Sequence, residues 1–246
     1  MPTAVRFMFK KLVMEGPIVT LCPGPMAYDE ALAKQVELHA QRLQDQIPDT
    51  LLLLQHRPVI TVGLSGGWQF LKVSREDLEK QGIDLRDTDR GGKITYHNPG
   101  QVVGYPIVKI SDHHWSVSDF VCHLQKMLIR VLADFGIVAE TREKIIGVWT
   151  KGKKIASVGI RLHQGVTRHG FALNVNNDLS GFQWMDPCGL AGCEMTSMQE
   201  EGVEVSTAEV EARIIHHWED LFESALESVN QNEIQEDTSC ERVAEG

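Results

Sequence analysis

The sequence lacks several features that mark whole classes of protein. Its longest uninterrupted apolar run, residues 51–54, is far below the ~18–20 residues needed to span a bilayer. Residues 1–14 are basic at Arg6, Lys10 and Lys11 but contain no apolar segment followed by a small-residue cleavage site, so they do not predict a secretory signal. The same basic residues leave an organelle-targeting role open.

Paired cysteines are also lacking. The chain has five cysteines, an odd number, and no two of them form a CxxC pair. A disulfide framework is therefore not expected, and a reducing cytoplasm is the predicted location.

Positive charge is scarce in the last third of the chain. Residues 1–168 hold 22 basic and 17 acidic residues, for a net charge of +5, whereas residues 169–246 hold 2 basic and 17 acidic residues, for −15. With a pI near 5.5 the chain is not expected to bind nucleic acid. The basic balance of the first part could still attract an acidic protein partner.

The 246 residues, 42% of them hydrophobic, are enough for one domain with a large core. Apolar periodicity predicts helices at 28–46, 74–82, 118–135 and 207–229, and strands at 51–55, 59–62, 94–97, 101–110, 147–150, 155–162 and 166–175. Turns at 151–153 and 163–165 predict two hairpins. Without regular βαβ alternation, this pattern favours an α+β fold with a mixed sheet and packed helices. We expect a single catalytic domain over residues 1–228 and an acidic, disordered tail over 229–246.

The segment from Arg90 to Gln101 combines two adjacent glycines with Arg, Lys and His. Such glycines allow a ligand to approach the backbone closely. The segment is not a phosphate-binding P-loop, because Ile94 stands where Ser or Thr is required. A tight hairpin with solvated charges is an equally compatible interpretation.

Lys154 ends a run of lysines at a predicted turn and begins an apolar strand. A lysine run in a turn is typical of a solvated surface. Lys154 differs because its position in the strand predicts partial desolvation, which would make it a usable proton acceptor.

Cys188 lies between Pro187 and Gly189 in a predicted loop, where a thiol can be presented in a fixed position. Near a cation, such a thiol can act as a nucleophile. An inert cysteine is the alternative. A zinc site built from Cys188, Cys193 and His169 is a further alternative, although one Cx4C pair is not a complete ligand set.

Two pairs of adjacent histidines, His113-His114 and His216-His217, do not suggest shared metal ligands. Neighbouring side chains on a helix or strand point in different directions. We expect these residues to lie on the surface.

Taken together, the chemically distinctive segments resemble the octanoyltransferase family of lipoate biosynthesis. The shared motifs follow in order over about residues 20 to 200: Arg90-Gly91-Gly92, His97, Pro99-Gly100-Gln101, Lys154-Ile155-Ala156-Ser157-Val158-Gly159, His169-Gly170-Phe171-Ala172-Leu173-Asn174-Val175, Pro187-Cys188-Gly189 and Thr196-Ser197. Asn98 departs from the family, which usually has glycine there. Because asparagine tolerates positive φ, we expect the turn to survive.

The resemblance implies a fold like that of lipoate and biotin protein ligases, without ATP, metal or another cofactor. It implies that Cys188 carries an octanoyl group as a thioester, with Lys154 as its catalytic partner. The implied donor is octanoyl-acyl carrier protein, and the implied acceptors are lipoyl domains of the glycine cleavage H protein and of 2-oxoacid dehydrogenase E2 subunits. The implied substrate pocket consists of Arg90, Gly91, Gly92, Lys93, Ile94, Thr95, Tyr96, His97, Ser157, Val158, Gly159, Gly170, Phe171 and Ala172.

Three other functions remain compatible with the sequence. An ATP-dependent lipoate or biotin ligase would not need a cysteine at position 188. A cysteine thioesterase would pass the acyl group to water. A non-catalytic carrier-protein binding module is the third, and the presence of both Cys188 and Lys154 argues against it.

Overall fold

The computed structural model describes residues 17–190 and 192–230, which form two β-sheets and four α-helices. The larger sheet has seven strands in the order β1-β2-β6-β10-β9-β8-β7. Only β1 and β2 among its neighbouring strands run parallel; the other pairs are antiparallel. The strands are β1 (Ile18–Met26), β2 (Thr50–His56), β6 (Gln101–Ile107), β7 (Glu140–Arg142), β8 (Ile145–Thr150), β9 (Lys153–His163) and β10 (Val166–Asn174).

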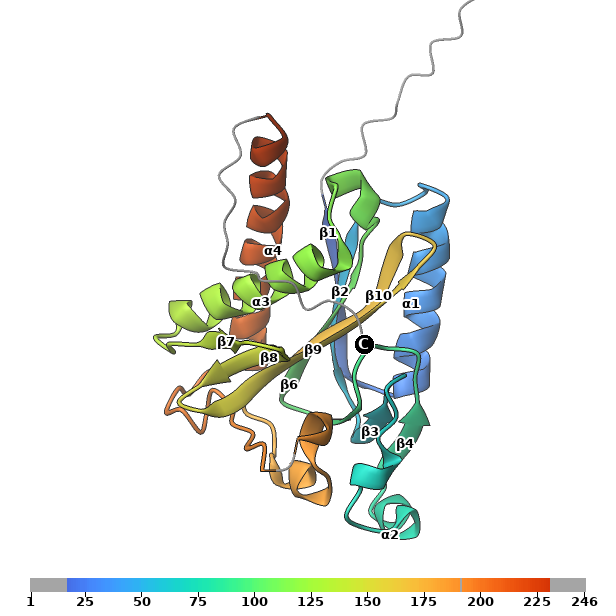
Figure 1. Cartoon of the computed structure of the whole chain (residues 1–246), viewed down its shortest axis with the longest axis vertical. Coiled ribbons are helices and arrows are strands. Elements are labelled where there is room, and N and C mark those ends of the chain that lie inside the picture. Colours follow the sequence, from blue (N-terminus) through green and yellow to red (C-terminus); the bar gives the residue numbers. More distant parts are fainter. Residues whose placement is uncertain (1–16, 191, 231–246) are drawn as a thin grey trace, which may run out of the picture.

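The smaller sheet has three strands in the order β4-β3-β5, with β3–β4 parallel and β3–β5 antiparallel. Its strands are β3 (Val59–Val62), β4 (Asp84–Asp87) and β5 (Ile94–His97). The helices are α1 (Tyr28–Leu43), α2 (Arg75–Lys80), α3 (Val117–Asp134) and α4 (Thr207–Asn230). The predicted α+β fold with a mixed sheet is confirmed (Figure 1).

Helix starts follow from local side-chain chemistry. Ser74 caps α2 by accepting a hydrogen bond from the Asp77 N–H at 3.1 Å, as the sequence predicted. Helix α3 begins at Val117, one residue earlier than the pattern suggested, because Ser116 forms a capping box with Asp119.

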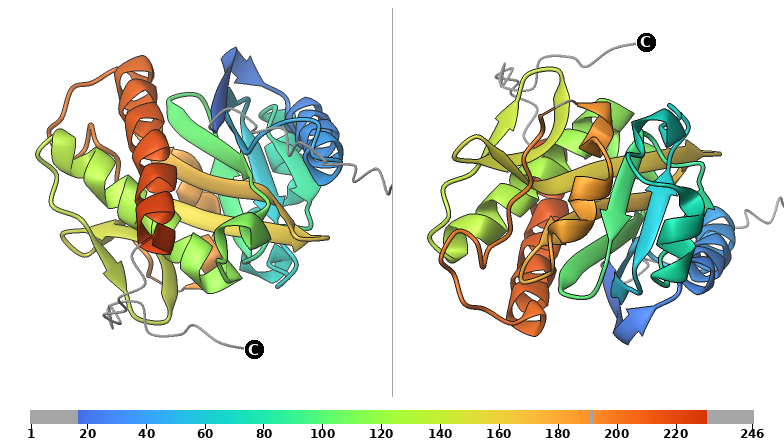
Figure 2. Two further views of the ribbon diagram at one scale, coloured as in Figure 1. Left: turned by 90° about the horizontal axis from the view of Figure 1, so that it is seen from above. Right: turned by 90° about the horizontal axis from the view of Figure 1, so that it is seen from below.

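The seven-stranded sheet is covered on both faces, and strand alternation decides which residues face which layer. Leu51 and Leu53 on β2 belong to the core that contains the apolar sides of α3 and α4, whereas Leu52 and Leu54 pack with Ala31 of α1. Figures 1 and 2 show α3 crossing α4 on one side of the sheet and α1 on the other.

A second hydrophobic core lies under the three-stranded sheet. It joins Ile60, Ile94 and Tyr96 to Phe182 and Met185, which come from the chain just before Cys188. The segment that carries the cysteine is therefore packed on the smaller sheet, not on the larger one.

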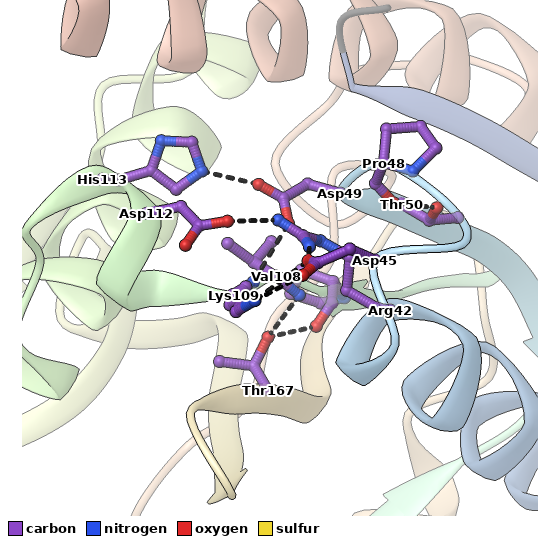
Figure 3. A network of polar contacts seen from close by, with 11 residues as sticks. Arg42, Asp45, Pro48, Asp49, Thr50, Val108, Lys109, Asp112, His113 and Thr167 are labelled. Carbon is purple, nitrogen blue, oxygen red and sulfur yellow. Dashed lines mark hydrogen bonds and ion pairs between the residues drawn. The ribbon is translucent and has the colours of Figure 1, made fainter. Parts of the chain in front are cut away.

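Some elements differ from the sequence prediction. Strand β6 ends at Ile107, and a short 3-10 helix over Ile110–His113 replaces the predicted end of the strand. His113 is not a simple surface residue, since its Nε2 lies 2.6 Å from the buried Asp49 carboxylate (Figure 3). The His113 ring also stacks on Trp115.

No helix within residues 17–190 and 192–230 is both long and apolar enough to cross a membrane. The predicted tail over 229–246 lies, beyond residue 230, outside the described residues.

Candidate active site

The turn at residues 187–189 holds Cys188 in an unusual backbone conformation. Cys188 has φ 57° and Gly189 has φ 68°, both in the left-handed region. The turn is closed by hydrogen bonds from Gly189 N–H to Asp186 O at 2.9 Å and from Leu190 N–H to Pro187 O at 3.1 Å. A cysteine at positive φ is uncommon, and such conformations concentrate at functional sites.

The cysteine turn is fixed to the region of the three-stranded sheet. Asp186 N–H donates to Phe70 O at 3.0 Å, and the Asp186 carboxylate pairs with Lys72 at 2.6 Å. A side chain at Gly189 would collide with the Phe70 ring at 2.7 Å and with Lys93 Cδ at 2.6 Å. Glycine at this position therefore lets the turn lie against both residues.

Lys154 comes from the seven-stranded sheet and meets Cys188 from the other side. Its Nζ donates to Cys188 Sγ at 2.9 Å and to the Ile146 carbonyl oxygen at 3.1 Å. The side chain is 1% exposed, and among the described residues no carboxylate forms an ion pair with it. Two residues 34 positions apart in sequence thus form a pair between a buried lysine and a partly exposed cysteine.

The backbone around Lys154 holds it in place. Its N–H donates to Glu194 O at 2.8 Å and its carbonyl oxygen accepts from Thr196 N–H at 2.9 Å. The segment after Cys188 therefore runs as a short parallel bridge beside the start of β9. The Thr196-Ser197 motif, buried in the structure, serves this contact.

A cavity of about 470 Å³ extends from the lysine–cysteine pair. Thirteen of the fourteen predicted pocket residues line it: Arg90, Gly91, Gly92, Lys93, Ile94, Thr95, His97, Ser157, Val158, Gly159, Gly170, Phe171 and Ala172. Apolar side chains that the motifs did not indicate, among them Val117, Ile145 and Ile146, complete the wall.

Tyr96 is the one predicted pocket residue that does not line this cavity. It lies on β5 between Thr95 and His97, so its side chain points to the opposite face of the strand. There its ring packs edge-on against Phe182 and Trp184, with ring centroids 5.7 Å apart in each case. A contiguous motif cannot distinguish the two faces of the strand that it contains.

The glycines of the Arg90 segment serve a close backbone contact. Gly91 N–H donates to Ile160 O on β9 at 2.9 Å, and a Cβ at Gly159 would lie 2.8 Å from Gly91 O. The Arg90 guanidinium donates to Thr61 Oγ1 and to the Thr61 carbonyl oxygen. Burial lowers the pKa of Arg90. The loop closes the cavity on the β9 side and brings a buried cation to its wall.

Neutral aromatic and imidazole groups form the end of the cavity near α1. Burial lowers the pKa of His97 to about 3 and that of His169 to about 4. Burial also raises the pKa of Tyr28 to about 12 and that of Tyr105 well above its usual value. At neutral pH these four side chains are uncharged, so they make this end of the cavity polar without adding charge to it.

Two of these side chains, Tyr105 and His169, are oriented by hydrogen bonds to residues that do not line the cavity. The sequence did not single out Tyr105 or Asp89. Tyr105 Oη lies 2.6 Å from His56 Nε2, and Asp89 binds His169 Nε2 at 2.7 Å. Although burial would raise it, the His169 hydrogen bond holds the pKa of Asp89 low. Neither residue lies in a chemically suggestive sequence context, and only the fold brings them to the cavity.

The asparagine at position 98 uses its side chain and not a positive φ. The left-handed residue of this turn is Gly100, at φ 89°. Asn98 Nδ2 donates to Asp178 O at 2.9 Å, and its Oδ1 accepts from Asn177 Nδ2 at 3.0 Å. The turn survives, but for a different physical reason from the one expected.

The chain matches the family model described as lipoyl protein ligase A/B catalytic domain over residues 27–219. It is 45% identical over 201 residues to an octanoyltransferase of Syntrophobacter fumaroxidans, covering 81% of this chain and 88% of that protein. An octanoyltransferase of Desulfotalea psychrophila is 41% identical over 203 residues, covering 81% and 91%. The chain belongs to the octanoyltransferase family.

Solved structures of lipoate ligases share the fold of this octanoyltransferase family member. Lipoate-protein ligase A bound with ATP superimposes with a TM-score of 0.65 at 16% identity, covering 85% of this chain and 86% of the other. Ta0514, a putative lipoate protein ligase from T. acidophilum with bound lipoic acid, gives 0.63 at 16% identity, covering 85% and 87%. The expected similarity to lipoate ligases is therefore confirmed at the level of the fold.

Proposed function

We propose that this protein transfers an octanoyl group from octanoyl-acyl carrier protein to a lysine of a lipoyl domain through a thioester on Cys188. The observation that supports this most directly is the 2.9 Å contact between Lys154 Nζ and Cys188 Sγ at a largely apolar cavity. The reaction belongs to lipoate biosynthesis, consistent with the octanoyltransferase relatives.

In the first half-reaction, the Cys188 thiolate, paired with the Lys154 ammonium, attacks the donor carbonyl carbon. The bond from that carbon to the phosphopantetheine sulfur breaks. Lys154 gives its proton to the departing sulfur, so the products are the octanoyl-enzyme, a neutral Lys154 amine and a free carrier thiol.

In the second half-reaction, the ε-amine of the acceptor lysine attacks the thioester carbonyl. An amide bond forms, and the bond to Cys188 Sγ breaks. The Lys154 amine accepts the proton that the acceptor nitrogen loses, which restores the ammonium–thiolate pair. A thioester is already activated, so neither step needs ATP.

The cavity suits an eight-carbon chain because its lining is mostly apolar. Valine, isoleucine and phenylalanine side chains from α3, β8, β9 and β10 face it, among them Val121, Ile146, Val158 and Phe171. Burying about seven methylene or methyl groups at ~0.8 kcal/mol each would contribute roughly 5 kcal/mol to binding of the chain.

The partners, the domain boundaries and the location belong to the same proposal. The net charge of +5 over residues 1–168 favours an acidic donor protein. Three lysines line the cavity, Lys93, Lys144 and Lys154, and Lys144 is highly exposed at the turn between β7 and β8. We treat residues 1–228 as one catalytic domain without a bound cofactor, and the cytoplasm as the compartment in which it meets both partners.

A mass measurement tests the covalent step. The full-length protein is mixed with octanoyl-carrier protein alone, and we expect it to gain one octanoyl group that hydroxylamine removes. Cys188→Ser is the control and should gain no hydroxylamine-sensitive group. A wild-type protein that transfers octanoate without ever forming this adduct would exclude the covalent mechanism.

The same experiment separates the competing functions. A thioesterase would release free octanoate without any acceptor domain. A lipoate-type ligase would need ATP and free acid. Stable octanoyl-enzyme that passes its acyl group to a lipoyl domain without ATP fits only the proposed transferase.

A further inference from the structure

The carbonyl oxygen of Ile146 binds the Lys154 ammonium, and the next carbonyl along β8, that of Gly147, is held by a buried hydrogen bond from α3. Gln125 Nε2 donates to Gly147 O at 2.8 Å. Gln125 is 9% exposed, and it is the only side-chain amide among the buried residues of α3, which are otherwise apolar or sulfur-containing. Burying an amide costs free energy unless it is hydrogen-bonded, so the Gln125–Gly147 contact satisfies a group that the core would otherwise reject.

Gly147 leaves the space that the Lys154 side chain occupies. It has φ 142°, and a Cβ placed there would lie 2.5 Å from Lys154 Cε and 3.0 Å from Lys154 Nζ. It would also approach Ala156 O at 2.8 Å. Any side chain at position 147 must therefore displace the end of Lys154 or separate β8 from β9.

The strand pairing does not fix this part of β8 against β9. The ladder between the two strands starts at Val148, opposite Ala156, and its register shifts before Trp149 pairs with Lys154. Ile146 and Gly147 lie before that first pair. By holding the Gly147 carbonyl, Gln125 thus fixes the backbone next to the Ile146 carbonyl that faces Lys154.

The Ile146 carbonyl oxygen is a neutral acceptor for the buried ammonium, which forms no ion pair with a carboxylate in the part of the chain that the structure describes. It accepts from Lys154 Nζ at 3.1 Å, while Cys188 Sγ accepts at 2.9 Å. Two acceptors at fixed positions define where Nζ points. A movement of the carbonyl would redirect the ammonium away from the sulfur and weaken its stabilisation of the thiolate.

We infer that Gln125 and Gly147 are positioning residues for Lys154, acting through the backbone at Ile146 and Gly147. This inference rests on the proposed role of Lys154 as the partner of the Cys188 thiolate. Neither residue touches the reacting atoms of the substrate, so their effect must appear as a change in the reactivity of Cys188.

The test compares four variants of the full chain: Gln125→Met, Gly147→Ala, Lys154→Ala and Leu128→Met. Gln125→Met keeps the volume of the side chain and removes the donor. Leu128→Met alters the buried face of the same helix without removing a hydrogen-bond donor and is the matched control. The rate of Cys188 alkylation by iodoacetamide is measured from pH 6 to pH 10, followed by kcat and KM for the octanoyl donor.

Losing one such hydrogen bond should slow alkylation of Gln125→Met at pH 7 by roughly 2- to 10-fold. Its half-maximal rate should move to higher pH, and kcat should fall while KM stays within about 2-fold. Gly147→Ala should show a larger shift in the same direction, and Leu128→Met should match the wild type. A purely structural role would lower the melting temperature without moving the pH profile.

The two hypotheses fail in different ways. The positioning role is wrong, and the proposed function stands, if Lys154→Ala shifts the pH profile of alkylation while Gln125→Met keeps the wild-type profile. If Gln125→Met does not fold, Gly147→Ala is used for the same comparison. If Lys154→Ala leaves the profile unchanged, the proposed function itself has lost its basis.

Discussion

Two buried cations in this protein differ in the partners that surround them. Arg42, at the end of α1, binds three carboxylates: Asp49 at 2.7 Å, Asp45 at 2.5 Å and Asp112 at 2.7 Å (Figure 3). Lys154 binds a thiol and a carbonyl oxygen, and no carboxylate within residues 17–190 and 192–230 forms an ion pair with it. The first arrangement joins elements of the fold, whereas in the proposed mechanism the second leaves a charge available to the Cys188 sulfur.

The comparison teaches that a buried charge serves stability or chemistry according to its partners. Around Arg42, hydrogen bonds from Lys109 N–H at 3.0 Å and from His113 at 2.6 Å also satisfy Asp49. Every group there is compensated, and removing one of them leaves another buried and unpaired. At Lys154, the proposed mechanism assigns the role of counter-charge to the Cys188 thiolate.

The largest expected effect comes from removing Lys154 from the Lys154–Cys188 pair. Lys154→Ala should slow octanoyl transfer by at least about 100-fold, because it removes both the partner of the thiolate and the group that moves protons. Both half-reactions should slow, as measured by formation of the octanoyl-enzyme and by its discharge onto a lipoyl domain. The melting temperature should stay near that of the wild type. Normal acylation of Cys188 near neutral pH would contradict the proposed role.

Breaking the carboxylate network around Arg42 should lower stability and leave activity unchanged. Asp49→Ala leaves Arg42 with two partly exposed carboxylates and His113 without its acceptor, and should lower the free energy of unfolding by about 3 kcal/mol. Urea unfolding at pH 7 measures this change. The specific activity of the folded fraction should be that of the wild type, and a large loss of kcat would show that the two regions are coupled.

The same carboxylate predicts a dependence of stability on pH. Although burial would raise it, the hydrogen bond from His113 leads the contacts that hold the pKa of Asp49 below its usual value of 3.8. A group with a depressed folded-state pKa contributes stability above its unfolded pKa and loses it as pH falls through the folded pKa. The free energy of unfolding of the wild type should therefore fall more steeply below about pH 4 than that of Asp49→Asn. Parallel curves for the two proteins would exclude this contribution.

The smallest expected effect concerns Tyr96. Because its ring packs against Phe182 and Trp184 away from the cavity, Tyr96→Phe should leave kcat and KM for the donor within about 2-fold of the wild type. Steady-state kinetics of octanoyl transfer provide the measurement. A tenfold rise in KM would mean that the hydroxyl reaches the substrate after all.

The sequence predicted which residues take part in the chemistry better than it predicted how they meet in space. The ordered motifs around Lys154 and Cys188 indicated the reacting pair, but their contact depends on a bridge beside β9 that no local pattern encodes. Strand β1 was missed because Pro23, Gly24 and Pro25 interrupt it. Proline is tolerated there because β1 is an edge strand.

Long-range contacts also explain the remaining errors. His113 was expected on the surface, yet it is recruited by Asp49, 64 positions earlier. Asp89 and Tyr105 looked like ordinary loop and core residues until the fold placed them against His169 and His56. Periodicity reports on the face of one element, and it contains no information about which distant residue will meet that face.

The anchoring of Cys188 has a consequence for how the protein loses activity. Its turn is tied to Phe70 and packs on the core of the three-stranded sheet, while Lys154 belongs to the seven-stranded sheet. The proposed nucleophile and its lysine partner are therefore held by two different hydrophobic cores. A local opening of the smaller core would separate Cys188 from Lys154 while the larger core stayed intact. The reactivity of the Cys188 thiol therefore reports on whether the two sheets remain packed together.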